Sequence, residues 1–254
     1  MKISVCSIVF LIFPLMTFQS LALADVGNVT AVAREGNRLV LTCGNDVVVF
    51  QVCTEHILMV NYQPQGIEDP DTLVVANTHW PPCTATFDTS GNPITVQNTR
   101  FRIEINRKPM RFHGYDAGGA CLFEEPSDEG LYENSLKLKI PPSNFYGIHN
   151  KPHGSTLTNN TGGLISAGSQ GGAGAPFVWT PKGWGLLADT DGGRIDISTN
   201  RLVFSRPDSP NKRDLEVYFI FGSPKEIING MTDISGKPPL FPKFTLGFLN
   251  TEWG

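Results

Sequence analysis

Several kinds of sequence signal are missing or scarce in this chain of 254 residues. Charged residues make up only 17% of it, and no block of lysine and arginine occurs. Nucleic-acid binding is therefore not expected, because such proteins contact phosphates through clustered basic side chains. The chain also lacks a G-x-S-x-G elbow, a Walker GK[ST] sequence and a C-x-x-C pair. These absences argue against a serine hydrolase of that type, a Walker phosphate loop and a zinc site.

The first 24 residues have the pattern of an export signal. Lys2 supplies a positive charge, Ile8 to Met16 form an apolar run, and Ala22-Leu23-Ala24 resembles a cleavage site. A membrane anchor is the alternative, but the apolar run is shorter than the roughly 20 residues that span a bilayer. We therefore expect a secreted or periplasmic protein, cleaved after Ala24, with no membrane segment in residues 25–254.

The cysteines are consistent with export. Cys43, Cys53, Cys83 and Cys121 remain after removal of the signal. An even number permits disulfide bonds in an oxidising compartment, and buried free thiols are the alternative. A hairpin turn at residues 44–46 would place Cys43 opposite a residue near Val47 and far from Cys53, which disfavours a Cys43–Cys53 bond.

Short apolar stretches separated by turn residues run through most of the chain. The 26 glycines and 19 prolines favour many turns and few long helices. Residues 101–106 alternate strictly between apolar and polar, as a half-buried strand does. This density of strands predicts an antiparallel β-sandwich. The predicted strands are 38–42, 47–52, 57–62, 72–76, 85–88, 94–97, 101–106, 135–140, 177–179, 184–188, 194–198, 202–205 and 215–221.

One helix is predicted near the end of the chain. Ser223, Pro224 and Glu226 form a capping box with proline at the first helical position. Apolar residues then follow at helical spacing, and Gly236 ends the helix before two prolines. After the helix, a further apolar strand is expected over residues 244–249. The glycines between Gly162 and Gly174 predict one long flexible loop, either a plain surface loop or one that shapes a ligand site.

Three other patterns have a functional and a structural interpretation. Residues 189–193, with Asp196, resemble part of a calcium loop, but Gly193 stands where the loop needs a ligand, and a hairpin turn between 185–188 and 194–198 is the simpler explanation. His149 and His153 are four residues apart, yet Pro152 argues against the shared helix face that a metal pair needs. Several aromatic residues could stack on sugar rings or pack in turns and core. These are Phe145, Tyr146, Trp179, Trp184 and Trp253.

The order of several motifs resembles the N-terminal region of glycoside hydrolase family 31, the α-glucosidase and α-xylosidase family. The most specific block is residues 232–248, with Gly236-Lys237-Pro238-Pro239-Leu240, which is similar to the family's "LTGKPPLPPKWALGF". Residues 182–189 resemble "KGYGVFFDN", and residues 215–226 resemble "LDYYFIAGPTPKE". Shorter matches are Phe145-Tyr146-Gly147-Ile148 to "YGLGE" and Ala175-Pro176-Phe177 to "PF". The resemblance covers residues 28–254.

This resemblance implies a galactose-mutarotase-like supersandwich followed by a (β/α)₈ barrel. It assigns residues 25–222 to the N-terminal β-sandwich domain and residues 223–254 to a linking helix and the start of a truncated barrel. In the family, the two catalytic aspartates of a retaining mechanism lie on the barrel, beyond the point that matches Gly254. No catalytic residue is therefore expected in this chain, no cofactor or metal is implied, and the chain alone is expected to be inactive.

The family resemblance also implies sugar contacts from the lead domain. A loop before the "PF" strand carries an aspartate that contacts the sugar, and the matching loop here is residues 157–163. The aspartate position corresponds to Asn160, with Asn159 as the neighbouring choice. Trp253 ends the first barrel strand, whose C-terminal end would face the active site. These three residues are the predicted substrate-binding residues. Asn160, and His149-Asn150 in place of "GE", indicate a divergent subgroup, for which an α-galactoside is one candidate substrate.

The leading hypothesis is the N-terminal domain of an exported retaining α-glycosidase. Its partners would be an α-linked oligosaccharide or glycoside and the catalytic barrel of the same polypeptide. The alternative is a free-standing secreted carbohydrate-binding β-sandwich without catalysis. An aldose epimerase shares the type of sandwich, but no His/Glu pair on rigid strands can be assigned for it.

Overall fold

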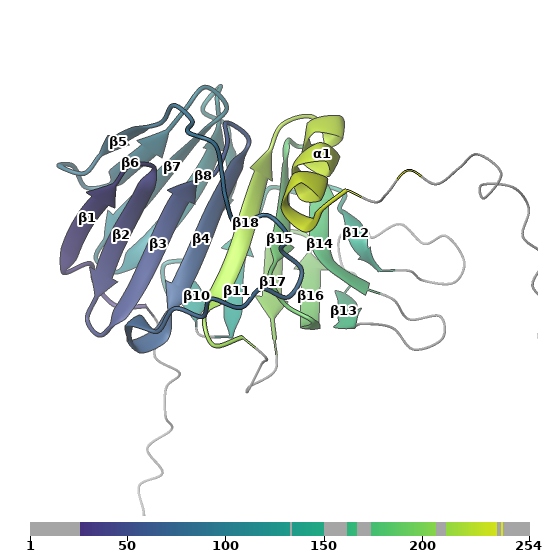
Figure 1. Ribbon diagram of the computed structural model, residues 1–254, viewed down its shortest axis with the longest axis horizontal. Coiled ribbons are helices and arrows are strands. Elements are labelled where there is room, and N and C mark those ends of the chain that lie inside the picture. Colours follow the sequence, from purple (N-terminus) through teal and green to yellow (C-terminus); the bar gives the residue numbers. More distant parts are fainter. Residues whose placement is uncertain are drawn as a thin grey trace, which may run out of the picture.

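The described part of the chain folds into two layers of antiparallel strands with one α-helix. The computed structural model describes residues 26–132, 134–149, 162–166, 174–206, 212–237 and 240, with backbone alone for 148, 149, 162–166 and 174. The front layer in Figure 1 has the strand order β1-β2-β3-β4-β18-β15-β14-β12. Its strands are β1 (Ala31–Glu35), β2 (Arg38–Cys43), β3 (Asp46–Val52), β4 (Ile57–Gln63), β18 (Leu215–Phe221), β15 (Trp184–Ala188), β14 (Gly174–Thr180) and β12 (Tyr146–His149).

The back layer has the order β5-β6-β7-β8-β9-β11-β17-β16-β13. The two layers meet where β13 pairs with β14 at Ser166 and Gly174. The fold is therefore the predicted β-sandwich, joined along one edge. The back strands are β5 (Thr86–Asp88), β6 (Ile94–Gln97), β7 (Phe101–Arg107), β8 (Met110–Asp116), β9 (Cys121–Glu124), β11 (Ser135–Lys139) with the short β10 (Leu131–Tyr132), β17 (Arg201–Ser205), β16 (Gly192–Ser198) and β13 (Gly162–Ser166).

The inter-layer core is built from the apolar residues that alternate along these strands. In β7, residues 101, 103 and 105 are buried and the residues between them are partly exposed. Aromatic rings fill the centre, where Phe123 stacks on Phe219 with centroids 4.5 Å apart and contacts Trp184 at 5.0 Å. Phe112 meets Phe219 edge to face at 5.7 Å. Such rings remove large apolar areas from water, so this core is the main source of stability.

The helix covers part of the opposite side of the front layer. Helix α1 (Pro224–Ser235) begins as predicted, and the Glu226 carboxylate accepts hydrogen bonds from Ser223 N at 2.8 Å and Ser223 Oγ at 2.7 Å. Its buried residues Ile227, Gly230 and Ile234 face β18, β15 and β14 (Figure 1). No helix in the described part of the chain is long and apolar enough to cross a membrane.

A long connection also crosses the outer face of the front layer. After the short 3-10 helix η1 (Pro64–Gly66), residues 67–85 pass in front of the layer and reach the end of α1, where Ala76 N donates to Ile234 O at 2.9 Å. We call residues 67–80 the covering segment. The predicted strand at 72–76 is wrong, because the amides of Leu73 and Val74 bond to the Asp189 carboxylate instead of a strand.

Two further predictions about turns are corrected by the strand pairing. Strand β15 pairs with β14 and β18 in the front layer, whereas β16 pairs with β13 and β17 in the back layer. The predicted hairpin at 189–193 is therefore a crossing between layers. The predicted long loop also begins too early, since residues 162–166 form β13 and pair with β16.

The four predicted mature cysteines are free in the structure. The predicted turn is confirmed, with Cys43 opposite Asp46, and Cys43 faces the inter-layer core while Cys53 lies on the outer face of the front layer. These opposite faces explain why Cys43 and Cys53 do not pair. Burial raises the pKa of Cys43 to about 12, so this thiol stays protonated.

Candidate functional site

The strands on either side of the predicted sugar-contacting loop lie at the edge where the two layers join. Asn159, Asn160 and Trp253 lie outside the described residues, as do residues 150–161 and 241–254. The structure does place the strands that flank the loop. Strand β12 ends at His149 in the front layer, and β13 begins at Gly162 beside β16 (Figure 1). The described residues that flank positions 150–161 in the sequence therefore both belong to the joined edge.

The aromatic residues at this edge divide into core and surface groups. Trp184 and Phe145 are each 1% exposed and meet edge to face at 5.8 Å, so the core interpretation is correct for them and sugar stacking is excluded. Tyr146 and Trp179 instead stack on each other, with centroids 4.9 Å apart, on half-buried positions of β12 and β14. This pair is the aromatic surface nearest in sequence to the loop.

Gly147 explains why β12 can lie so close to β14. It has φ +104, and a Cβ placed on it would lie 2.5 Å from Phe177 O. Any other side chain would be strained and would push the strands apart. The glycine of this motif is thus required by the close packing of β12 on β14.

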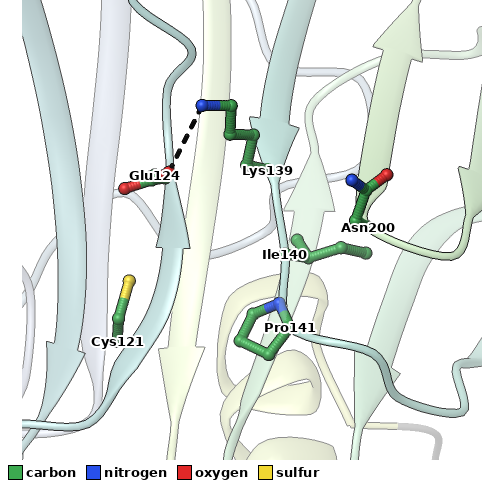
Figure 2. Close-up of a pocket in the computed structure, with 6 residues that line it drawn as sticks. All are labelled: Cys121, Glu124, Lys139, Ile140, Pro141 and Asn200. Atoms are coloured by element: carbon green, nitrogen blue, oxygen red, sulfur yellow. Dashed lines mark ion pairs between the residues drawn. The ribbon is translucent and has the colours of Figure 1, made fainter.

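A shallow hollow in the back layer is a second candidate site (Figure 2). Strands β9 and β11 pair only at Glu124 and Lys139, which leaves a cavity of about 290 Å³ bordered by Cys121, Ile140 and Asn200. The Lys139 and Glu124 side chains form an ion pair at 3.6 Å across its rim. Burial raises the pKa of the Cys121 thiol, which favours the unreactive protonated form. This hollow therefore carries no evident catalytic group.

A buried cluster of charged side chains lies beneath the covering segment. Lys212 and Asp214 are 1% and 0% exposed, and Asp189 is 1% exposed. The Lys212 ammonium lies 3.2 Å from Asp189 Oδ2 and 3.4 Å from Asp214 Oδ1. Asn61 Nδ2 donates to Asp214 Oδ2 at 2.7 Å and to Glu216 Oε2 at 3.0 Å, and Tyr218 OH donates to Glu216 Oε1 at 2.6 Å. We call these six residues the outer-face polar cluster.

The electrostatics of the polar cluster follow from burial and pairing. Burial raises the pKa of the Glu216 carboxyl, while the Tyr218 hydrogen bond and the Lys212 charge oppose that shift. Burial alone would lower the pKa of Lys212, but the surrounding carboxylates outweigh it and raise the pKa. Lys212 thus stays charged. Because one ammonium neutralises several carboxylates, removal of that ammonium would leave buried charges unpaired.

The polar cluster also holds the covering segment in place. Lys212 Nζ donates to the carbonyl oxygens of Asp71 at 2.7 Å and Asp69 at 3.3 Å. The Asp189 carboxylate accepts from the amides of Leu73 and Val74 at 2.9 and 2.7 Å. Asp189 is therefore engaged with Lys212 and the backbone, which is inconsistent with its use as a first calcium ligand. Among the described residues, no group of three or more ligand side chains is arranged to hold a metal ion.

Sequence reasoning missed this cluster, although a signal was present. Residues 212, 214, 216 and 218 are polar and alternate with the apolar residues 215, 217 and 219. A period of two places these side chains on one face of a strand. Several charged side chains on one face indicate either a face exposed to solvent or a buried network of paired charges. Whether this face is exposed or buried depends on the covering segment, whose position cannot be predicted from the sequence of β18.

Comparison with known proteins identifies relatives of the whole chain. No protein-family model matches it. The chain is 34% identical over 251 residues to a 1,6-α-glucosyltransferase of Sporosarcina globispora, a match that covers 91% of this chain and 20% of that protein. The chain therefore spans one fifth of that relative's length.

Solved structures show the same fold. A family 31 dextranase of Flavobacterium johnsoniae in complex with isomaltotriose matches with a TM-score of 0.76 and 21% identity, covering 89% of this chain and 30% of that one. The cycloalternan-forming enzyme of Listeria monocytogenes, with a pentasaccharide substrate, matches with a TM-score of 0.71 and 18% identity over 87% of this chain and 23% of that one. A family 31 α-xylosidase from a soil metagenome, in complex with xylose, matches with a TM-score of 0.73 and 15% identity. That match covers 86% of this chain and 36% of the xylosidase. In sequence this chain resembles the N-terminal region of glycoside hydrolase family 31 enzymes, and its β-sandwich has the fold of the matching part of these proteins.

Proposed function

We propose that this chain is the N-terminal β-sandwich region of an exported enzyme that cleaves α-glycosidic bonds by a retaining mechanism. The observation that carries the proposal is the 34% identity to a 1,6-α-glucosyltransferase across 91% of the chain. The sugar complexes of the dextranase and the cycloalternan-forming enzyme support an α-linked oligosaccharide as ligand. The relative's name adds that a second sugar, as well as water, is a candidate acceptor for the glycosyl group.

The role proposed for this region is binding and positioning. A retaining enzyme uses two carboxyl groups about 5–5.5 Å apart, one as nucleophile and one as acid and base. The buried carboxylates of the described residues are engaged within the protein, so they are not available to a substrate. Those of the polar cluster bind Lys212, Asn61 and the covering segment, and the Glu125 carboxylate accepts a hydrogen bond from Phe112 N. The catalytic aspartates are therefore assigned to chain beyond Gly254, and Asn159, Asn160 and Trp253 to sugar contacts.

The geometry of the joined edge supports this assignment. The loop that carries Asn159 and Asn160 connects β12 and β13, and α1 contacts β14 beside them. An asparagine amide both donates and accepts hydrogen bonds, so it can bind a sugar hydroxyl without the charge of an aspartate. Export is proposed from the signal pattern that ends at Ala24.

Two measurements test the proposal. Residues 25–254 should release no nitrophenol from 4-nitrophenyl α-glycosides, and measurable release would show that the catalytic groups lie within this chain. Reading the gene beyond codon 254 should show an open frame that encodes a barrel with an aspartate at the end of a strand. A stop codon there, together with saccharide binding by the chain alone, would instead favour the free-standing carbohydrate-binding module.

A further inference from the structure

A small cavity lies between the covering segment and the outer face of the front layer. Its volume is about 220 Å³. Its floor is a row of cross-strand neighbours, in which Arg38 pairs with Gln51, Gln51 with Met59, and Met59 with Tyr218. Glu216 borders one side of this floor, and Trp80 of the covering segment forms the opposite wall. The cavity is distinct from the joined edge, because its floor is supplied by β2, β3, β4 and β18.

The walls of this cavity are held by buried bonds within the protein. Lys212 binds the carbonyl oxygens of Asp69 and Asp71, and Asp189 binds the amides of Leu73 and Val74. The far end of the covering segment is tied to α1 through the amides of Ala76 and Asn77, which donate to Ile234 O. A preformed site loses little conformational entropy when a ligand enters, which favours binding.

The lining combines an aromatic ring with groups that donate and accept hydrogen bonds. The centroids of the Trp80 and Tyr218 rings lie 6.5 Å apart and the ring planes are tilted by 48°, so the indole is not stacked on the Tyr218 ring. Gln51 is a polar residue of the floor that can both donate and accept hydrogen bonds, whereas the Glu216 carboxylate is already bonded to Asn61 and Tyr218. The exposed Thr72 and Thr78 also line the space. A pyranose ring has an apolar C–H face and a ring of hydroxyls, and it therefore matches an aromatic wall opposite polar groups.

Charge and size narrow the class of ligand. The charge of Arg38 is balanced by Glu68 at 3.8 Å and that of Lys212 by Asp189 and Asp214, so the lining presents no unbalanced positive charge. The buried Arg38 Nε has no hydrogen-bond partner within the protein, so it can donate to a ligand hydroxyl. A neutral ligand is thus favoured over an anion or a metal ion. The volume is below the roughly 300–1,000 Å³ of pockets for larger organic ligands, which limits the occupant to a single ring.

We propose that this cavity binds one terminal pyranose unit of a neutral glycan, as a second sugar site separate from the loop of Asn159 and Asn160. The choice of an α-glucosyl unit rests on the proposed function. The argument for a sugar site rests instead on the cavity, with its aromatic wall and polar floor, and does not depend on that function. The site would hold the end of a long saccharide against the sandwich and raise its local concentration near the joined edge.

Binding of methyl α-D-glucopyranoside to the 254-residue chain tests the proposal. The backbone amide NMR signals of Thr72 and Thr78, which line the cavity and are kept in every variant below, should shift saturably in the millimolar range. Trp80→Ala should weaken binding about tenfold, equivalent to about 1.4 kcal/mol, and Gln51→Met should weaken it by a similar factor. Trp80→Phe keeps an aromatic wall and should retain most of the affinity. Gln97→Met, on an exposed position of β6, is the matched control and should bind as the unaltered chain does.

Asn160→Ala separates this proposal from the proposed function. If Trp80→Ala and Gln51→Met bind normally while Asn160→Ala abolishes binding, the second site is wrong and the loop assignment stands. Loss in Trp80→Ala and Gln51→Met, with normal binding by Asn160→Ala, supports the second site whatever the enzyme proves to be. No saturable shift in the millimolar range in the unaltered chain overturns the second site. Thermal unfolding followed by circular dichroism verifies that each variant is folded.

Discussion

The two sides of β18 are buried in opposite ways. Toward the back layer the strand presents Val217, Phe219 and Phe221, which pack with other apolar side chains. Toward the covering segment it presents Glu216 and Tyr218, whose burial depends on hydrogen bonds and on the nearby Lys212. The apolar side gains stability from each area removed from water. The polar side is stable only while its charges are paired, so it fixes where the covering segment lies more than it adds net stability.

The largest expected effect comes from removing the one cation of the polar cluster. Lys212→Met keeps most of the buried stem but leaves Asp189 and Asp214 without their ion pair, and the free energy of unfolding should fall by about 3–5 kcal/mol. Chemical denaturation measures this difference. Arg213→Ala is the control, since Arg213 is exposed and its loss should change stability by less than about 0.5 kcal/mol.

A second substitution tests whether the loss of stability in Lys212→Met is caused by unpaired buried charge. Asp214→Asn added to Lys212→Met removes one of the unpaired charges and should recover part of the stability. If the double variant is as unstable as the single one, loss of packing rather than unpaired charge explains the effect, and the contrast between the two sides of β18 would be weaker than argued.

The apolar side should respond to volume instead of charge. A Cβ added at Gly114 of β8 would lie 2.2 Å from Cζ of Phe123, whose ring fills the space above the glycine. Gly114→Ala should therefore destabilise the fold by about 1–3 kcal/mol through overpacking, measured by thermal or chemical unfolding. Phe123→Leu in the same chain should relieve part of that strain. Gly192→Ala is the control, because no atom lies within 4 Å of a Cβ there.

The smallest expected effect is a change in the pH dependence of stability. The pKa of Glu216 is raised above 4.5 in the folded chain, so between 4.5 and the raised pKa the folded state holds more protons than the unfolded state. The free energy of unfolding contributed by Glu216 must then decrease as pH rises through this window. Glu216→Gln removes this decrease, so its stability relative to the unaltered chain should improve with pH.

Denaturant unfolding at a series of pH values measures that trend. Glu68→Gln, which removes an exposed carboxylate at the rim of the same cavity, is the control and should keep the slope of the unaltered chain. Parallel stability curves for Glu216→Gln and the unaltered chain would show that Glu216 is not buried as a charged group, and the polar side would then resemble an ordinary solvated surface.

Local sequence signals predicted most strands and the helix, and the failures have identifiable causes. Strand β8 was missed because Gly114 interrupts its alternating pattern, and the gap is filled by Phe123 from β9. Residues 72–76 have the composition of a strand, but their amides bond to a carboxylate from a distant turn. The 189–193 turn looks like a hairpin locally, although β15 and β16 belong to different layers.

The candidate site shows the same division. The motif Phe145-Tyr146-Gly147-Ile148 could be recognised in the sequence, and the structure explains its glycine by the close approach of Gly147 to Phe177. The cavity beside Trp80 could not be predicted, because its floor and its wall come from segments far apart in the chain. The composition of the chain does not show which of its threonines and glutamines line this cavity and which face solvent.

The sequence by itself determined most of the strands, where helix α1 starts and which family the motifs resemble. These properties depend on neighbours within a few residues, through alternation, capping and turn geometry. Only the tertiary structure decided which strands pair and which charged side chains are buried. The free energy of burying Lys212 depends on Asp189 and on the carbonyls of Asp69 and Asp71, which only folding brings to it.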